Sequence, residues 1–234
     1  MSKASKKLNS EKSRRIVSYM VFITLVLSMI YSVIHIFLAP SDGGMLAPGE
    51  KAKSDYTLML VQCILGIVVM FLPSMIEKRM KITIPSYMHI CYILFLHASI
   101  YLGEVRSFYY EVPHWDTILH TFSGFMLGAV GYSIVELLNT QAKIKVNMSQ
   151  IFVAMFAFSF AVATGVLWEI YEFTVDRIFS LNMQKYALQN GVPLLGAEAL
   201  MDTMKDLIVD TLGALAFVIV TFVGKKSIGR RKKI

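Results

Sequence analysis

Ionisable side chains recur at helical spacing in three apolar stretches of this 234-residue chain. Residues three or four apart in a helix lie on the same face, so each stretch carries a polar stripe along one side of its helix. The three stripes are Asp116 and His120, then Glu169, Glu172 and Asp176, then Asp202, Asp206 and Asp210.

Carboxylates in an apolar setting repel one another and are costly to bury unless a positive charge or a proton neutralises them. Arg106, Arg177 and Lys205 are too few for this, and carboxylates with imidazole suit a divalent metal ion. The predicted metal ligands are His120, Glu169, Asp206 and Asp210. The predicted general bases are Glu172 and Asp116. The predicted supporting residues are His114, Asp176 and Asp202. Of these, His114 is also a further candidate nitrogen donor.

Helix caps and salt bridges offer a structural explanation for part of the same pattern. Asp116 and Asp202 begin their stretches, where acids favour the helix dipole. Asp176 could pair with Arg177, and Asp202 with Lys205. The sequence leaves both interpretations open for these residues.

The composition is that of a membrane protein. Hydrophobic residues make up 56% of the chain and charged residues 17%, with a mean hydropathy of +0.58. A soluble domain of this length needs far less apolar sequence. The predicted fold is an all-α bundle of six transmembrane helices forming a single domain, with spans at 16–38, 57–75, 87–104, 115–138, 151–178 and 205–224.

Basic residues predict the orientation of the spans. With six spans, most Lys and Arg residues fall at the two termini and in the loops 76–86 and 139–150, on one side of the membrane. The positive-inside rule then places both termini in the cytoplasm of a bacterial cell, in its inner membrane. The three polar stripes all lie toward the opposite, outer side.

The net charge of +7 is concentrated beside the first and last spans. Basic clusters next to apolar spans are typical of anchors on anionic lipid headgroups, so we expect the bilayer as partner and no nucleic acid. Gly124 and Gly128 form a GxxxG pattern that predicts close approach of another helix and a rigid support for the site.

The motifs WDTILHTFSGFMLG, WEIYEFTVD and MDTMKDLIVDTLGAL resemble those of the YjdF-like bacterial inner-membrane proteins, over residues 105–217. A looser similarity extends to VanZ-like membrane proteins. The resemblance supports the topology and the importance of the polar stripes, and it implies no reaction.

Three functions fit this pattern. The first is a metal-dependent enzyme that acts on a lipid or a cell-envelope precursor at the outer leaflet. The second is a non-catalytic scaffold or accessory protein, in which the acids hold a structural cation or a basic partner segment. The third is a proton- or cation-coupled transporter, although the inner halves of spans four to six carry few ionisable groups besides Glu136.

Overall fold

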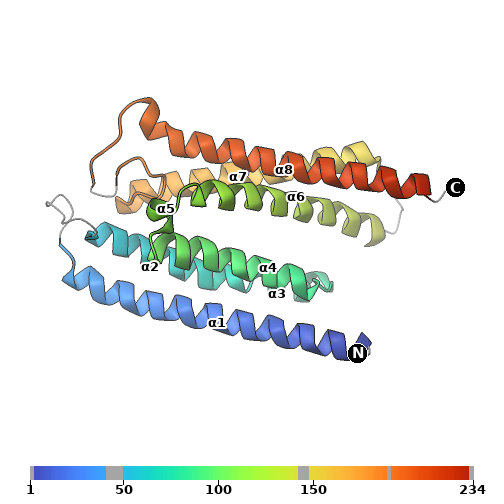
Figure 1. The fold of residues 1–234 in the computed structure, drawn as a ribbon, viewed down its shortest axis with the longest axis horizontal. Helices are drawn as coiled ribbons and strands as arrows, with labels where there is room; N and C mark the ends of the chain where they lie inside the picture. Colours follow the sequence, from blue (N-terminus) through green and yellow to red (C-terminus); the bar gives the residue numbers. More distant parts are fainter. Residues whose placement is uncertain (1–2, 41–49, 142–147, 189–190, 232–234) are drawn as a thin grey trace. The chain divides into compact units, whose positions relative to one another are not determined.

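The computed structural model describes residues 3–40, 50–141, 148–188 and 191–231. Nine helical elements follow one another in this part of the chain (Figure 1). They are α1 (Lys3–Leu38), α2 (Lys53–Met70), α3 (Leu72–Met80), α4 (Ser86–Leu96), η1 (His97–Val105), α5 (Phe108–Glu111), α6 (Trp115–Gln141), α7 (Gln150–Phe179) and α8 (Ala197–Arg231).

Six helical segments are long and apolar enough to cross a membrane, and the described residues contain no β-strand. The predicted all-α class with six spans is therefore confirmed. The segments are Asn9–Leu38, Lys53–Met80, Ser86–Val105, Trp115–Asn139, Gln150–Phe179 and Ala197–Gly224.

Three predictions concern residues outside the described part. The outer loop predicted at 39–56 falls largely on 41–49, and the cytoplasmic lysines Lys143 and Lys145 fall on 142–147. The anionic-lipid anchors depend mostly on side chains before residue 9 and after residue 224, which are likewise not described.

The described chain divides into two compact units. Unit 1 is built from the residues up to Trp115, together with 180–182 and 187–192. Unit 2 is built from 116–179, 183–186 and the residues from Pro193 onward. A single membrane domain that contains both units stays a prediction.

In unit 1, α1 packs along α2 and α4 (Figure 1). Leu25, Cys63 and Ile93 are fully buried at its centre. At one end Arg14 of α1 pairs with Glu77 of α3 at 3.2 Å. These contacts tie the first three spans together through an apolar core and one partly buried ion pair.

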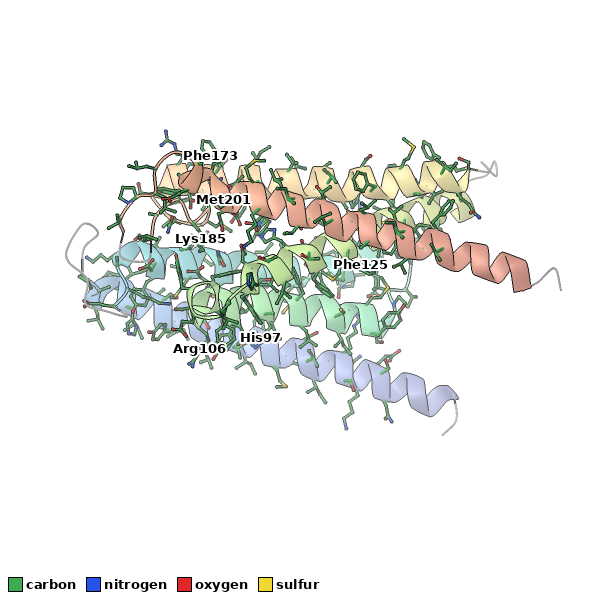
Figure 2. The ribbon with its side chains drawn as sticks, turned by 45° about the horizontal axis from the view of Figure 1, so that its top comes forward. His97, Arg106, Phe125, Phe173, Lys185 and Met201 are labelled. Atoms are coloured by element: carbon green, nitrogen blue, oxygen red, sulfur yellow. The ribbon has the colours of Figure 1, made fainter. Side chains whose placement is uncertain are left out.

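The third span changes its helical type halfway. After α4 the chain continues as η1, a π-helix that runs from His97 to the residue before Arg106, both labelled in Figure 2. The amide of Arg106 bonds to the carbonyl of Tyr101, five residues earlier, at 2.9 Å. Such wide turns are rare, and the apolar sequence here gave no sign of one.

In unit 2, α6, α7 and α8 run side by side (Figure 1). Glycines set the spacing of these helices. A Cβ atom at Gly124 would overlap the backbone carbonyl of Asp210, and one at Gly213 would overlap the carbonyl of Thr121. The backbones of α6 and α8 are therefore in direct contact, which fixes the side chains between them.

The last span begins earlier than predicted, at Ala197 in place of residue 205. Gly196 has a φ of +58°, which permits the sharp entry, and Glu198 favours the first turn through the helix dipole. The outer connection predicted at 179–204 is shorter as a result, and Asp202 lies inside the helix.

Candidate functional site

The relative register of α7 and α8 follows from one glycine contact. The C-terminal end of α7 and the N-terminal part of α8 are joined through 183–184, so the two helices are antiparallel. A Cβ at Gly165 would lie 3.0 Å from the Oδ2 atom of Asp210. One helical turn further along each helix, Glu169 therefore lies level with Asp206.

Glycine contacts also give the register of α6 with α7 and α8. It runs parallel to α8, with Gly124 against the backbone of Asp210, and antiparallel to α7, where a Cβ at Gly131 would lie 3.0 Å from the Cα of Ala157. Counting three turns back from this contact brings His120 level with Glu169.

The polar side chains of unit 2 thus form three levels, about 6 Å apart along the helices because four residues rise about 1.5 Å each. We number the levels from the N-terminal ends of α6 and α8. The first contains Asp116, Glu172 and Asp202, the second His120, Glu169 and Asp206, and the third Ser123, Gly165 and Asp210.

His120 is the centre of this arrangement. Its Nδ1 atom lies 3.2 Å from Oδ2 of Asp210. Its Nε2 atom lies 3.7 Å from Oδ1 of Asp116 and 3.9 Å from Oδ2 of Asp206. A carboxylate can only accept, so Nδ1 donates to Asp210, and Nε2 faces the other two acids at distances too long for hydrogen bonds.

Asp210 is itself held in place. The hydroxyl of Ser123 donates to its Oδ1 atom at 2.6 Å. Gly165 leaves the room that Oδ2 needs to reach the imidazole. Asp210 is buried, with 4% of its surface exposed, so these partners fix its carboxylate in one orientation.

Asp116, His120 and Asp206 are the described residues whose arrangement fits a metal ion. One ligand atom from each lies within 4.8 Å of the other two. The set combines two carboxylate oxygens with one imidazole nitrogen, a donor set that binds divalent ions such as Mn²⁺ or Zn²⁺.

Glu169 and Asp206 are deeply buried, at 5% and 2% exposed, and three of their four carboxyl oxygens make no hydrogen bond of regular geometry within the described residues. Neither carboxyl oxygen of Glu169 makes a hydrogen bond of regular geometry within the described residues, although the Thr203 hydroxyl lies near enough to interact. Oδ1 of Asp206 also has none there. Buried acceptors without donors are costly, so these oxygens are candidates for binding something else.

Glu172 and Asp176, on the same stripe, have partners. The indole of Trp168 donates to Oε1 of Glu172 at 2.8 Å. Asp176 accepts from the backbone amides of Met183 and Gln184, at 2.7 and 2.9 Å. Asp176 thus bonds to the connection between α7 and α8. Its predicted role as a support of the metal site stays a prediction.

This connection carries a lysine into the acidic region. Lys185 has a φ of +51°, and its charge interacts with Glu172, Asp176 and Asp202. Figure 2 shows Lys185 at the same end of the unit as Phe173 and Met201. Gln184 also donates to Thr203 of α8 at 3.0 Å, so the connection is fastened at both of its neighbouring helices.

The structure brings most of the predicted site residues together in unit 2. His114 is exposed, has a φ of +60° and belongs to unit 1. Sequence reasoning missed Ser123, Trp168, Thr203 and Lys185. Ser123 follows His120 by three residues and Trp168 precedes Glu172 by four, so helical spacing was a signal for these two residues. Nothing in the sequence indicated Lys185.

The described residues of unit 2 also enclose a cavity of about 130 Å³ away from this site. It lies toward the other end of the same helices, between Tyr132, Asn139, Val153 and Phe217. None of the three levels contributes to its walls. The cavity therefore belongs to a different part of unit 2 from the polar site.

Replacing Asp176 by alanine is expected to lower the free energy of unfolding by about 2 kcal/mol or more, because two amides would lose their acceptor. Loosening of the α7–α8 connection should expose it to protease. Limited proteolysis of Asp176→Ala beside Asp176→Asn, which keeps one acceptor, measures this. Equal cleavage of wild type and Asp176→Ala would contradict the assignment.

Comparison with known proteins adds a family. The family model described as "Predicted membrane protein (DUF2238)" matches residues 17–227. A Thermotoga maritima protein, described as uncharacterized, is 32% identical over 155 residues, which is 66% of this chain and 67% of the relative. No solved structure matches.

The YjdF-like group predicted from the motifs is this same family, whereas the similarity to VanZ-like proteins stays a prediction. The family match covers all six spans, including the first two, which carried no recognisable motif. The chain belongs to the DUF2238 family of predicted membrane proteins.

Proposed function

We propose that unit 2 binds a divalent cation between Asp116, Nε2 of His120 and Asp206. The observation that supports this most directly is the orientation of His120, whose second nitrogen faces two carboxylates at 3.7 and 3.9 Å. Ligand atoms about 2.0–2.2 Å from one ion lie roughly 3–3.5 Å apart, so these three atoms, which lie within 4.8 Å of one another, would draw closer on binding and leave further positions for water or substrate. Asp116 is a ligand in this proposal, in place of a general base.

Asp210 acts on the cation through His120. Histidine ligands usually donate their other N–H to a carboxylate, which fixes the ring and raises its basicity. The 3.2 Å contact from Nδ1 to Asp210, with Ser123 behind it, has this geometry. In this proposal Asp210 therefore has a positioning role, whereas the sequence alone predicted it as a ligand.

Asp210→Asn is expected to weaken the affinity for the cation about 10- to 100-fold. Asp116→Asn should weaken this affinity further, because it removes a ligand. Titration of the detergent-purified protein with Mn²⁺ measures both. Glu136→Gln is the control, since Glu136 lies near the other end of α6 and bonds to Tyr132 at 2.8 Å. An unchanged affinity in Asp116→Asn would refute the proposed ligand set.

The protein spans the inner membrane of a bacterial cell in our proposal, with both termini in the cytoplasm and the three levels toward the outer side. Six crossings place the termini on one side, and the basic termini select the cytoplasm. The basic tails would meet anionic headgroups there. A fusion of an alkaline phosphatase to the C-terminus would be active only if this orientation were reversed.

The activity that this site supports best is metal-dependent hydrolysis or group transfer on a lipid or envelope precursor. Glu172 is the proposed general base, since it lies level with the ligand Asp116 and its charge interacts with that residue. The cation would activate water or polarise the substrate, and Glu172 would accept the proton.

Glu172→Gln should therefore retain the cation but lose at least about 100-fold in turnover. The measurement compares lipid products in vesicles of total membrane lipid incubated with wild type or variant protein. No change in any lipid with the wild-type protein, in the presence of bound cation, would favour the scaffold function instead.

A transport function finds less support. Toward the other end of the helices, beside the cavity described above, Phe217 packs against Gly128 and Phe160 packs against Gly131. Among the described residues, the carboxylates of the three levels do not continue past Asp210 into this part.

A further inference from the structure

We infer that unit 2 binds a second divalent cation between Glu169 and Oδ1 of Asp206, so that Asp206 bridges two ions. This inference rests on the proposed function, because the first cation occupies the other oxygen of the same carboxylate. Oδ2 of Asp206 faces His120 at 3.9 Å, whereas Oδ1 is buried without a hydrogen-bond partner in the described part of the chain.

Glu169 provides the independent evidence. Both of its carboxyl oxygens are buried without a regular hydrogen bond to any described residue, and the register of α7 with α8 places it level with Asp206. Glu169 is 5% exposed, and its charge interacts with His120, Asp202 and Asp210, so it belongs to the buried cluster and is not exposed on the surface of unit 2. Three buried acceptor oxygens at one level, with no regular hydrogen bond to a described residue, suit a hard cation.

The charges of the cluster agree with two ions. Seven carboxyl groups lie in or beside the three levels, and they outnumber the basic groups that interact with them, which include Lys185, Lys205 and His120. One divalent ion leaves an excess of negative charge in a buried setting, which two ions reduce. The seven are Asp116, Glu169, Glu172, Asp176, Asp202, Asp206 and Asp210.

A pair of ions about 3.5–4 Å apart, bridged by a carboxylate, suits substrates that carry a phosphoryl group, because both ions stabilise the oxygens of an in-line displacement. Asp116 and His120 would supply the other protein ligands of the first ion, and Glu169 would supply the other protein ligand of the second. The substrate class is accordingly a phosphate ester with an apolar portion, presented from the surrounding lipid.

The number of bound ions tests the inference. Equilibrium dialysis of the full-length, detergent-purified protein against Mn²⁺ should give two ions per chain, and the electron paramagnetic resonance spectrum should show a magnetically coupled pair. Glu169→Gln should bind one ion with an uncoupled spectrum, and Glu169→Asp should recover the second ion in part. Glu136→Gln, far from the levels, should bind two.

One ion per wild-type chain, unaffected by Glu169→Gln, would overturn the second site and leave the proposed function standing. No ion in the wild type would overturn both. Two ions in Glu169→Gln as well as in the wild type would show that Glu169 is not a ligand. The stoichiometry of the wild type decides the matter even if the variant is poorly folded.

Discussion

Asp206→Asn will make the cation-free protein more stable and remove its stabilisation by divalent cations. Asp206 is 2% exposed, and its oxygens face other acids and the imidazole of His120 without a regular hydrogen bond. Replacing a buried charge of this kind by a neutral amide of the same shape should raise the free energy of unfolding by about 1–3 kcal/mol.

The cation is expected to stabilise the wild type and to leave the stability of Asp206→Asn almost unchanged. A ligand present at 100 times its dissociation constant stabilises the native state by about 2.7 kcal/mol. The wild type should gain this amount on addition of Mn²⁺, and Asp206→Asn should gain almost nothing. Thermal unfolding in detergent, with and without Mn²⁺, measures both differences in one experiment.

The sign of the stability change that Asp206→Asn causes in the absence of metal separates a functional site from a purely structural one. If Asp206 were only a structural acid held by salt bridges or caps, its replacement would lower stability in the absence of metal. Asp206→Asn that is less stable than the wild type, together with an unchanged response to Mn²⁺, would favour the structural interpretation.

Gly124→Ala will destabilise unit 2 and weaken cation binding at the same time. A Cβ at this position would overlap the backbone carbonyl of Asp210, so the backbones of α6 and α8 must move apart. Overpacking of this kind typically costs about 1–3 kcal/mol, and the shift also displaces the carboxylate that orients His120.

Gly224→Ala is the matched control, because it makes the same change in α8 where nothing lies within 4 Å of the added carbon. Alanine is the better helix former by about 1 kcal/mol, so this variant should be as stable as the wild type or slightly more so. Unfolding in a denaturing detergent compares the two. Equal stability of Gly124→Ala and Gly224→Ala would show that the close contact at Gly124 is wrong.

The helices could be predicted from the sequence because length and hydropathy determine which segments can span a membrane. The structure differs from the predicted spans where the local conformation of the backbone, and not hydropathy, determines the type or the end of a helix. The last span starts at Ala197 because the chain is already helical before residue 205, although this part of it is more polar. The π-helix from His97 onward depends on packing within unit 1, and hydrophobic pattern carries no information about it.

The site was predictable to the level of single helices. Helical spacing places Asp116 with His120, and Asp206 with Asp210, on one face of their helices. It does not fix how far one helix is shifted along another, and that register is set by the glycine contacts at Gly124 and Gly165. The separate roles of Asp116, as a proposed ligand, and Asp210, as a proposed positioning residue, follow only from that register.

Elemental analysis of the protein purified without added metal or chelator tests the central claim most directly. The account predicts a divalent metal in stoichiometric amount in the wild type, its loss in Asp206→Asn, and its retention in Glu136→Gln. Metal-free wild-type protein that also fails to take up Mn²⁺, Mg²⁺ or Zn²⁺ would contradict it.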